Sequence, residues 1–377
     1  MTLSYCTNVH PAEDLDGVLA QLDRYAVPVR ERFGAELGLG LWLSAPVAAA
    51  LAADAAKRAE LGAALDARGL VVRTLNAFPY GGFHREVVKH AVYHPDWTTP
   101  ARLDYTLDCA TVLADLLPEG GAGSVSTLPL GWRHPWSPAD HATALARLGD
   151  AAAGLRALAD RTGRAVRLAV EPEPGCVVDD VADAVRLLGG RVDPGFVGLC
   201  LDTCHLAVSF ADPAEAVRSI DRAGLRVVKV QASAALELAD PTDAATVLGP
   251  FAEPRYLHQV RASGPGGVRR ADDLPEAFAE LPADGPWRVH FHVPLHADPP
   301  APLRSTTDVL RQAVAAVRQV GHTPDVEVET YTWSVLPGGV DDLAAGIAAE
   351  LRWAEENLAG EDPAGGSPAD EHAEVRA

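Results

Sequence analysis

Lysine is scarce in this sequence, since only Lys57, Lys89 and Lys229 occur among its 377 residues. Asp and Glu outnumber Lys and Arg by 52 to 32, which gives a formal net charge of −20. Proteins that bind nucleic acids neutralise phosphates with basic side chains. This charge balance therefore argues against DNA or RNA as a partner.

The sequence also lacks segments that would address or cross a membrane. Its first residues, MTLSYCTNVHPAEDL, contain neither the basic nor the apolar region of a signal peptide. No stretch reaches the roughly 18 apolar residues that span a bilayer. The five cysteines, at positions 6, 109, 176, 200 and 204, form no CxxC pair. This pattern is typical of reduced thiols, and we expect a cytoplasmic protein without membrane insertion.

Aromatic residues are few, at 6%, whereas hydrophobic residues make up 48% of the chain. A large core built mainly from Ala, Leu and Val is therefore expected. No repeat or linker divides the chain, and α/β barrels often exceed 250 residues as one domain. No GxGxxG motif follows the first expected strand, which argues against a dinucleotide-binding sheet and a nucleotide cofactor.

Short β-like segments alternate with helical segments along most of the chain, a pattern typical of a parallel sheet with helices outside. The expected strands lie at 5–10, 37–45, 70–80, 124–132, 167–174, 198–206, 226–234, 289–296 and 326–333. We predict a closed (β/α)₈ barrel as one domain over 1–358. These are nine segments, whereas the barrel has eight strands. We expect the extra segment within 226–296, because 235–286 looks like an insertion. The acidic tail at 359–377 is predicted to be disordered.

Polar side chains end several of the expected barrel strands, where such barrels build their active sites. They are Glu171, Asp202, Gln231, His292 and Glu329. A buried carboxylate such as Asp202 needs a cation or donor to satisfy it. Three converging carboxylates with an imidazole suit Mn²⁺, Mg²⁺, Zn²⁺ or Co²⁺. Cys200 and Cys204 are weaker ligand candidates, because a free cysteine is also an ordinary small buried residue.

Three of these segments, AVEPEPG, CLDTCHLAV and VEVETYTW, resemble strands of the xylose-isomerase-like barrel superfamily. That superfamily includes sugar epimerases, inosose dehydratases and endonuclease IV. More narrowly, YCTNVHP, KHAVYHPDW, YLHQV and WRVHFHVPLH together resemble the ebo-cluster metabolite traffic protein E family.

The superfamily resemblance implies roles for individual residues. Glu171, Asp202 and Glu329 match its metal-binding carboxylates, and the two glutamates also match the acid/base pair of the epimerases. His205 matches a histidine that contacts substrate, or that ligates a second metal in the endonuclease. Gln231 stands where the superfamily usually has a metal-binding histidine.

Other side chains are expected to complete the site. His292, or else His258, is the candidate for the missing imidazole, and with His258, Gln231 and His205 we expect His10 and Asn76 to line the substrate pocket. Trp132, Trp136 and Trp333 are candidates for an apolar wall. Strand alternation also predicts three inward side chains one layer deeper in the barrel. These are Lys229, His290 and Glu327, of which Lys229 and Glu327 should form a buried ion pair beneath the metal.

These features favour a metal-dependent isomerase or epimerase that acts on a sugar, sugar phosphate or cyclitol through an enediolate, with one divalent metal ion and room for a second. The alternative is a non-catalytic metabolite-binding or traffic protein on the same barrel. A metal-dependent phosphodiesterase is a remote alternative that the net charge disfavours. The sequence leaves the substrate, the metal and the oligomeric state open.

Overall fold

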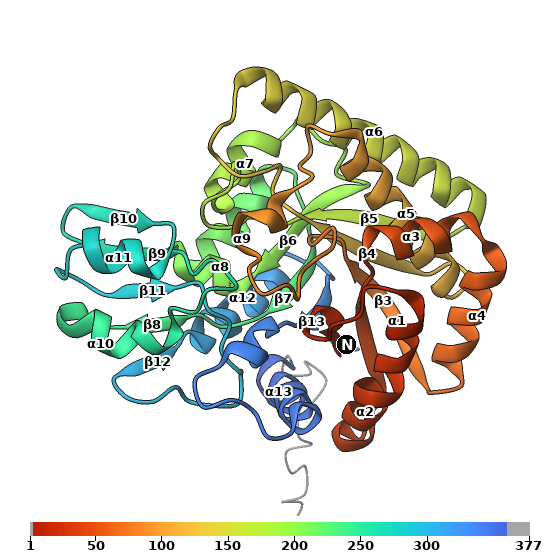
Figure 1. Cartoon of the computed structure of the whole chain (residues 1–377). Coiled ribbons are helices and arrows are strands. Elements are labelled where there is room, and N and C mark those ends of the chain that lie inside the picture. Colours follow the sequence, from red (N-terminus) through yellow and green to blue (C-terminus); the bar gives the residue numbers. More distant parts are fainter. Residues whose placement is uncertain (1–2, 360–377) are drawn as a thin grey trace, which may run out of the picture.

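The computed structural model describes residues 3–359 and contains a closed barrel of eight parallel strands (Figure 1). The strands follow one another around the barrel in the order β1-β13-β7-β6-β5-β4-β3-β2. Their bounds are β1 (Leu3–Cys6), β2 (Leu37–Trp42), β3 (Leu70–Asn76), β4 (Ala122–Thr127), β5 (Ala165–Val170), β6 (Val197–Asp202), β7 (Val227–Ala232) and β13 (Asp325–Val328). The predicted (β/α)₈ barrel is therefore confirmed. Nearly all of the expected tail at 359–377 lies outside the described residues.

Helices surround the barrel on its outside. They are α1 (Leu15–Gln21), α2 (Val27–Phe33), α3 (Ala45–Ala53), α4 (Ala55–Asp66), α5 (Pro100–Leu116), α6 (Pro138–Thr162), α7 (Val181–Leu188), α8 (Thr203–Val208), α9 (Pro213–Arg222), α12 (Thr307–Gln319) and α13 (Leu343–Leu358). Local sequence signals set the bounds of α6, which begins with a capping box between Ser137 and Asp140 and ends at Gly163, whose φ is +67°. None of the helices in the described chain is long and apolar enough to cross a membrane.

Barrel strands such as β6 are buried along their whole length, because the helices cover one face and the barrel interior covers the other. Inside the barrel, Gly40 of β2 makes room for a carboxylate. A Cβ at this position would lie 1.2 Å from Glu327 Oε2, so only glycine fits beneath that side chain.

A second sheet lies beside the barrel and is formed by the part of the chain that connects β7 to α12 (Figure 1). Its five antiparallel strands have the order β10-β9-β11-β8-β12. This segment consists of β8 (Leu236–Leu238), α10 (Ala244–Leu248), β9 (Val260–Gly264), β10 (Gly267–Ala271), α11 (Leu274–Glu280), β11 (Trp287–Val289) and β12 (Leu303–Ser305). The sheet thus continues past residue 286, where the sequence analysis ended the insertion. We call residues 236–305 the insertion.

The ninth expected strand, 289–296, is not a barrel strand. Only Val289 of this segment is in a strand, and it ends β11 of the second sheet. Alternating apolar and polar residues indicate which side chains of a strand are buried, but they do not indicate to which sheet the strand belongs. The extra segment does lie within 226–296, as predicted.

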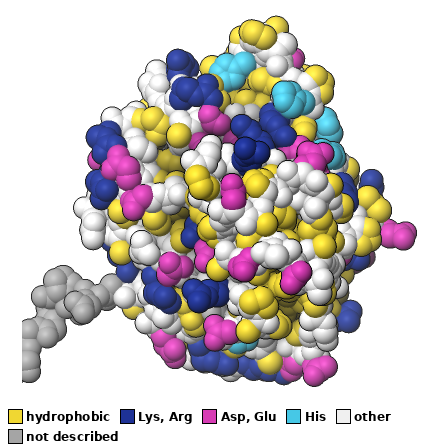
Figure 2. Space-filling view, turned by 90° about the vertical axis from the view of Figure 1, so that its left-hand side faces the viewer, with side chains coloured by type: hydrophobic (Ala, Val, Ile, Leu, Met, Phe, Trp, Pro, Cys, Tyr) yellow, Lys and Arg dark blue, Asp and Glu magenta, His cyan; other side chains and the backbone are white. Residues whose placement is uncertain are grey.

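The insertion packs on the barrel through apolar and polar contacts. Val260, Trp287 and Phe291 belong to the same buried hydrophobic cluster as the barrel strands. Arg288 Nη1 donates to the carbonyl of Ala207 in α8 at 2.8 Å. Figure 2, which looks at this side of the molecule, shows acidic and basic side chains interspersed with hydrophobic ones.

Candidate active site

Three buried carboxylates meet at the carboxyl ends of the barrel strands. Glu171 follows β5, Asp202 ends β6 and Glu329 follows β13. One oxygen from each lies within 4.8 Å of the others. The parallel strands bring these side chains together because their carboxyl ends all open at one end of the barrel.

On two of these carboxylates, one oxygen accepts hydrogen bonds from neighbouring groups. Glu329 Oε1 accepts hydrogen bonds from the side-chain amides of Asn8 and Asn76, at 2.8 and 3.0 Å. Asp202 Oδ1 accepts from the backbone amide of His205 at 2.9 Å and from the Ser233 hydroxyl at 2.8 Å.

Two other oxygens at this site are buried and have no hydrogen-bond partner among the described residues. They are Glu171 Oε2 and Asp202 Oδ2. Buried carboxylate oxygens are costly to leave unpaired. They are therefore available to an incoming cation or substrate hydroxyl.

Burial and mutual repulsion perturb the pKa values of the three carboxyls. The pKa of Glu171 is raised well above its usual value by burial and then by the charges of Glu329 and Asp202. The pKa of Glu329 is also raised well above its usual value, by burial and then by the charges of Asp202 and Glu327. Burial also raises that of Asp202, but His205 and His292 and the hydrogen bonds it accepts outweigh burial and lower its pKa. A hard divalent cation would relieve this repulsion, and the oxygen-rich donor set fits such an ion.

His292 brings an imidazole to the carboxylates from the insertion. Its Nδ1 lies 2.7 Å from the carbonyl of Glu329, which can only accept, so Nδ1 carries the hydrogen. The lone pair of a neutral ring is then on Nε2, which is buried, has no hydrogen-bond partner among the described residues and lies 3.8 Å from Asp202 Oδ2. His292 is thus oriented as metal-binding histidines usually are.

Gln231 and His258, the other residues considered for this position, are engaged elsewhere. Gln231 does not line the pocket, and its Oε1 accepts from the Cys200 thiol at 3.0 Å. Both ring nitrogens of His258 have partners at 2.9 Å, the carbonyl of His290 and a carboxylate oxygen of Glu253. The geometry thus favours His292 over His258 as the imidazole of this site.

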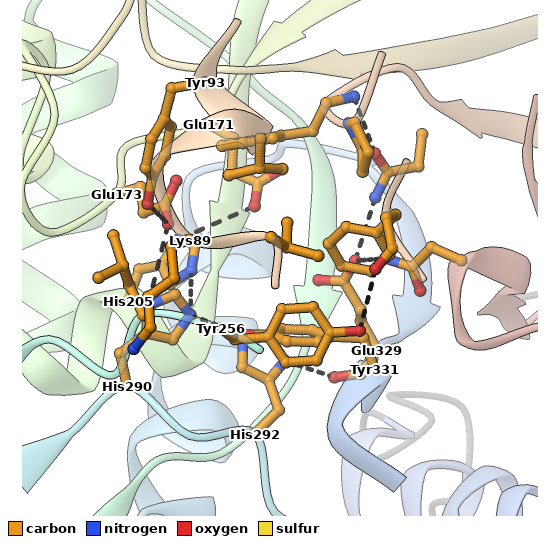
Figure 3. Close-up of a pocket in the computed structure, with 18 residues that line it drawn as sticks. Lys89, Tyr93, Glu171, Glu173, His205, Tyr256, His290, His292, Glu329 and Tyr331 are labelled. Atoms are coloured by element: carbon orange, nitrogen blue, oxygen red, sulfur yellow. Dashed lines mark hydrogen bonds and ion pairs between the residues drawn. The ribbon is translucent and has the colours of Figure 1, made fainter. Parts of the chain in front are cut away.

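A second group of polar side chains lies in the same pocket, beside Glu171 (Figure 3). His205 Nδ1 lies 2.9 Å from the carbonyl of Pro172, and its Nε2 lies 3.0 Å from His290 Nε2. His290 Nδ1 in turn lies 2.7 Å from Gln259 Oε1. This chain of hydrogen bonds joins the barrel to the insertion.

Glu173 belongs to the same group and is itself buried. Its Oε1 accepts from the Tyr93 hydroxyl at 2.8 Å, and burial raises its pKa to about 7. Ligand atoms of Glu173, His205 and His290 lie within 4.8 Å of one another, so this group could also hold an ion. Sequence reasoning missed Glu173. It stands two residues after Glu171 in EPEP, and side chains two residues apart in an extended segment usually point to the same side.

Aromatic side chains form much of the remaining wall of the pocket, whose volume is about 60 Å³. They are Phe78, Phe83, Tyr93, Tyr256 and Tyr331. The expected tryptophans do not line it, and Trp132 instead packs against Tyr93, with ring centroids 4.9 Å apart. Tyr256 belongs to the insertion, like His290 and His292, so the insertion closes one side of the pocket.

The remaining expected residues lie in different places. Asn76 lines the pocket beside Glu329, whereas His10 does not. His10 stacks on Tyr25 with ring centroids 4.1 Å apart, and burial lowers its pKa to about 3.

The inward layer beneath the site is partly as predicted. The buried pair of Lys229 and Glu327 is confirmed, since Lys229 Nζ lies 2.8 Å from Glu327 Oε1 and both side chains are fully buried. The placement of His290 in that deeper layer was wrong. His290 lines the same pocket as His292, because their segment is not a barrel strand.

The fold and the site define an α/β-barrel protein of the xylose isomerase-like type. The sequence model of the family described as Xylose isomerase-like TIM barrel matches residues 35–240, and the chain belongs to this family. A sequence comparison with curated proteins finds no match.

Solved structures share the fold over nearly the whole chain. A xylose isomerase-like TIM barrel protein from Mycobacterium smegmatis, in complex with magnesium, is 14% identical with a TM-score of 0.56, covering 95% of this chain and 98% of that one. D-allulose 3-epimerase from Methylomonas sp., in complex with D-allulose, is 12% identical with a TM-score of 0.53, covering 95% and 97%. A D-psicose 3-epimerase, in the presence of D-fructose, is 15% identical with a TM-score of 0.52, covering 96% and 100%.

Proposed function

We propose that this protein is a divalent-metal-dependent isomerase or epimerase of a polyhydroxylated small molecule. The observation that carries the proposal is the meeting of three buried carboxylates with an oriented imidazole. Glu171 Oε2, Asp202 Oδ2 and His292 Nε2 are all buried and lack a hydrogen-bond partner among the described residues. These three residues and Glu329 would hold the ion.

A bound divalent cation supplies Lewis-acid stabilisation of negative charge on substrate oxygens. The protein's own residues would move the proton between substrate carbons. Glu171 and Glu329 are the acid/base pair, and Asn8 and Asn76 hold the Glu329 carboxylate in place. General acid–base assistance by such a group is typically worth about 10²–10⁴-fold. His205 lines the pocket, and by the superfamily resemblance we expect it to contact the substrate.

The composition of the pocket favours a neutral sugar or cyclitol over a sugar phosphate. Among the described residues that line it, Lys89 is the only lysine or arginine, and its ammonium already pairs with Asp273. A phosphate would therefore meet mainly carboxylates and neutral groups. The aromatic walls suit the apolar faces of a sugar, and the epimerases of similar fold were solved with allulose and fructose.

We also place the chain within the ebo-cluster metabolite traffic protein E family, as a proposal that rests on the sequence motifs already quoted. Three of these motifs, KHAVYHPDW, YLHQV and WRVHFHVPLH, supply pocket residues, namely Lys89, Tyr93, Tyr256, His290 and His292. All five cysteines are free thiols, which supports our proposal of a reducing compartment such as the cytoplasm.

The test begins with the metal content of the purified protein, compared with that of Asp202→Ala and His292→Ala. Glu350→Gln serves as a control, because Glu350 is an equally buried carboxyl that bonds to Thr330 and Trp333 instead. We expect about one equivalent of divalent metal in the wild type and in the control, and loss of the metal in the two site variants.

Candidate ketoses and cyclitols are then incubated with the metal-loaded protein in D₂O. An epimerase introduces deuterium at a substrate carbon, and Glu171→Gln should abolish this exchange while ligand binding persists. Ligand binding without exchange in the wild type would favour the binding or traffic role. A folded wild type that takes up no Mn²⁺, Co²⁺, Mg²⁺ or Zn²⁺ would refute the proposed function.

A further inference from the structure

A second hollow opens at the opposite end of the barrel, where the strands begin. It has a volume of about 320 Å³, and its lining includes Arg73, Arg167 and Arg226. Arg167 precedes Glu171 by four residues, and Asp325 of the same hollow precedes Glu329 by four. At about 3.3 Å per strand residue, the hollow lies about 13 Å from the carboxylates of the proposed active site.

The three arginines of this hollow form few hydrogen bonds with the part of the chain that the structure describes. A guanidinium offers five N–H donors. Among the described residues, the only side-chain hydrogen bond of the three is that from Arg167 Nε to the carbonyl of Gly195, at 3.2 Å. Arg73 Nε is buried and has no hydrogen-bond partner within residues 3–359. None of the three arginines forms an ion pair within 4.0 Å in the described chain.

Other partly covered arginines of this acidic chain are of two kinds. Arg147, Arg164 and Arg255 donate to uncharged oxygens, and others pair with carboxylates. Arg133 pairs with Asp272, and Arg288 with Glu237. What distinguishes the hollow, in a protein of net charge −20, is that it gathers three arginines without an ion pair among the described residues around one cavity.

One carboxyl, Asp325, lines the hollow and only partly offsets the positive charge. Its Oδ2 accepts from the Ser124 hydroxyl at 2.7 Å. Three guanidinium groups against one carboxyl leave a positive excess. The remaining lining consists of Ala122, Gly123, Val227, Val228 and Thr323, and it adds no further charged side chain.

We propose that this hollow binds the phosphoryl group of inorganic phosphate or of a small phosphorylated metabolite. Arginine donors match phosphate oxygens in geometry and charge, and charge-assisted hydrogen bonds of this kind are strong. The volume falls within the range of small-molecule sites and exceeds what a bare phosphate needs. The site is separate from the carboxylate pocket and does not depend on the function proposed for that pocket.

Isothermal titration calorimetry with inorganic phosphate, at constant ionic strength and with NaCl as the reference, tests the proposal. We expect saturable binding of one equivalent by the full chain. Arg73→Gln and Arg226→Gln should each weaken it about tenfold or more. Arg226 is exposed, so that variant should fold even if Arg73→Gln does not. Arg269→Gln, which changes an exposed arginine of β10, is the matched control and should bind as the wild type does.

A parallel titration with glycerol 3-phosphate distinguishes the two sources of the phosphoryl group. A lower dissociation constant for glycerol 3-phosphate than for inorganic phosphate indicates that the site binds a phosphate ester. Asp202→Ala separates the two ends of the barrel, because it removes a proposed metal ligand and leaves the arginines intact. Binding that survives in Arg226→Gln but disappears in Asp202→Ala would assign the phosphate to a metal ion. That result, or no saturable binding by the wild type, overturns the proposal.

Discussion

The buried pair of Lys229 and Glu327 offers a direct test of how the barrel interior supports the site. Lys229 Nζ lies 2.8 Å from Glu327 Oε1 and 3.1 Å from the Ser126 hydroxyl, with no exposure to solvent. Burial lowers the pKa of Lys229, but the Glu327 carboxylate raises it by more, so the pKa lies above its usual value. The lysine therefore stays charged at every pH at which the protein is handled.

Replacing Lys229 by Met leaves the carboxylate of Glu327 buried without a cation. Breaking a buried pair from one side typically costs about 3–5 kcal/mol of unfolding free energy. Replacing both partners by apolar side chains removes the unpaired charge as well. The double variant Lys229→Met, Glu327→Leu should therefore regain most of that loss.

Urea unfolding, followed by tryptophan fluorescence, measures the unfolding free energy of both variants and of the wild type. We expect the midpoint to fall for Lys229→Met and to recover in the double variant. If the pair also orients the ligands above it, the affinity for Mn²⁺ should fall about tenfold or more in both variants. If Lys229→Met lowered the unfolding free energy by less than about 1 kcal/mol, the reasoning would be refuted, because a buried unpaired carboxylate should destabilise the fold by more than that.

Three further predictions concern the site and its support. His292→Ala should weaken Mn²⁺ binding about 100-fold or more by calorimetry, whereas Gln231→Ala should leave it within a few-fold, and equal losses would contradict our choice of imidazole. Asn76→Ala should lower the deuterium exchange rate about tenfold without unfolding, since it frees Glu329; an unchanged rate would count against this support. Burial raises the pKa of Glu350 from 4.5 to about 7, so its stabilising effect is complete below pH 4.5 and is lost as the pH rises to 7. That loss is about 3 kcal/mol, and Glu350→Gln should remove it from urea midpoints at pH 5 and 8; identical pH slopes would refute it.

Local sequence patterns were sufficient for much of the architecture. Runs of β-forming residues located the barrel strands, although the first strand, expected at 5–10, is Leu3–Cys6 and shares only two residues with that range. Glu171, Asp202 and Glu329 stood out because each directly follows or ends such a run. Strand alternation also predicted the pair of Lys229 and Glu327. These inferences succeeded because period, length and strand-end position are properties of neighbouring residues.

The sequence alone determined the fold class, the carboxylate-bearing strand ends and the buried ion pair. Tertiary structure decided what depends on residues far apart in the chain. Residues 289–296 have the alternation of a barrel strand but leave a second sheet, and this path carries His292 to the carboxylates, whereas Gln231 bonds to Cys200. The arginine hollow likewise arises only when the starts of separate strands meet. A pattern along the chain records whether a side chain will be covered, whereas the group that covers it is fixed only by packing.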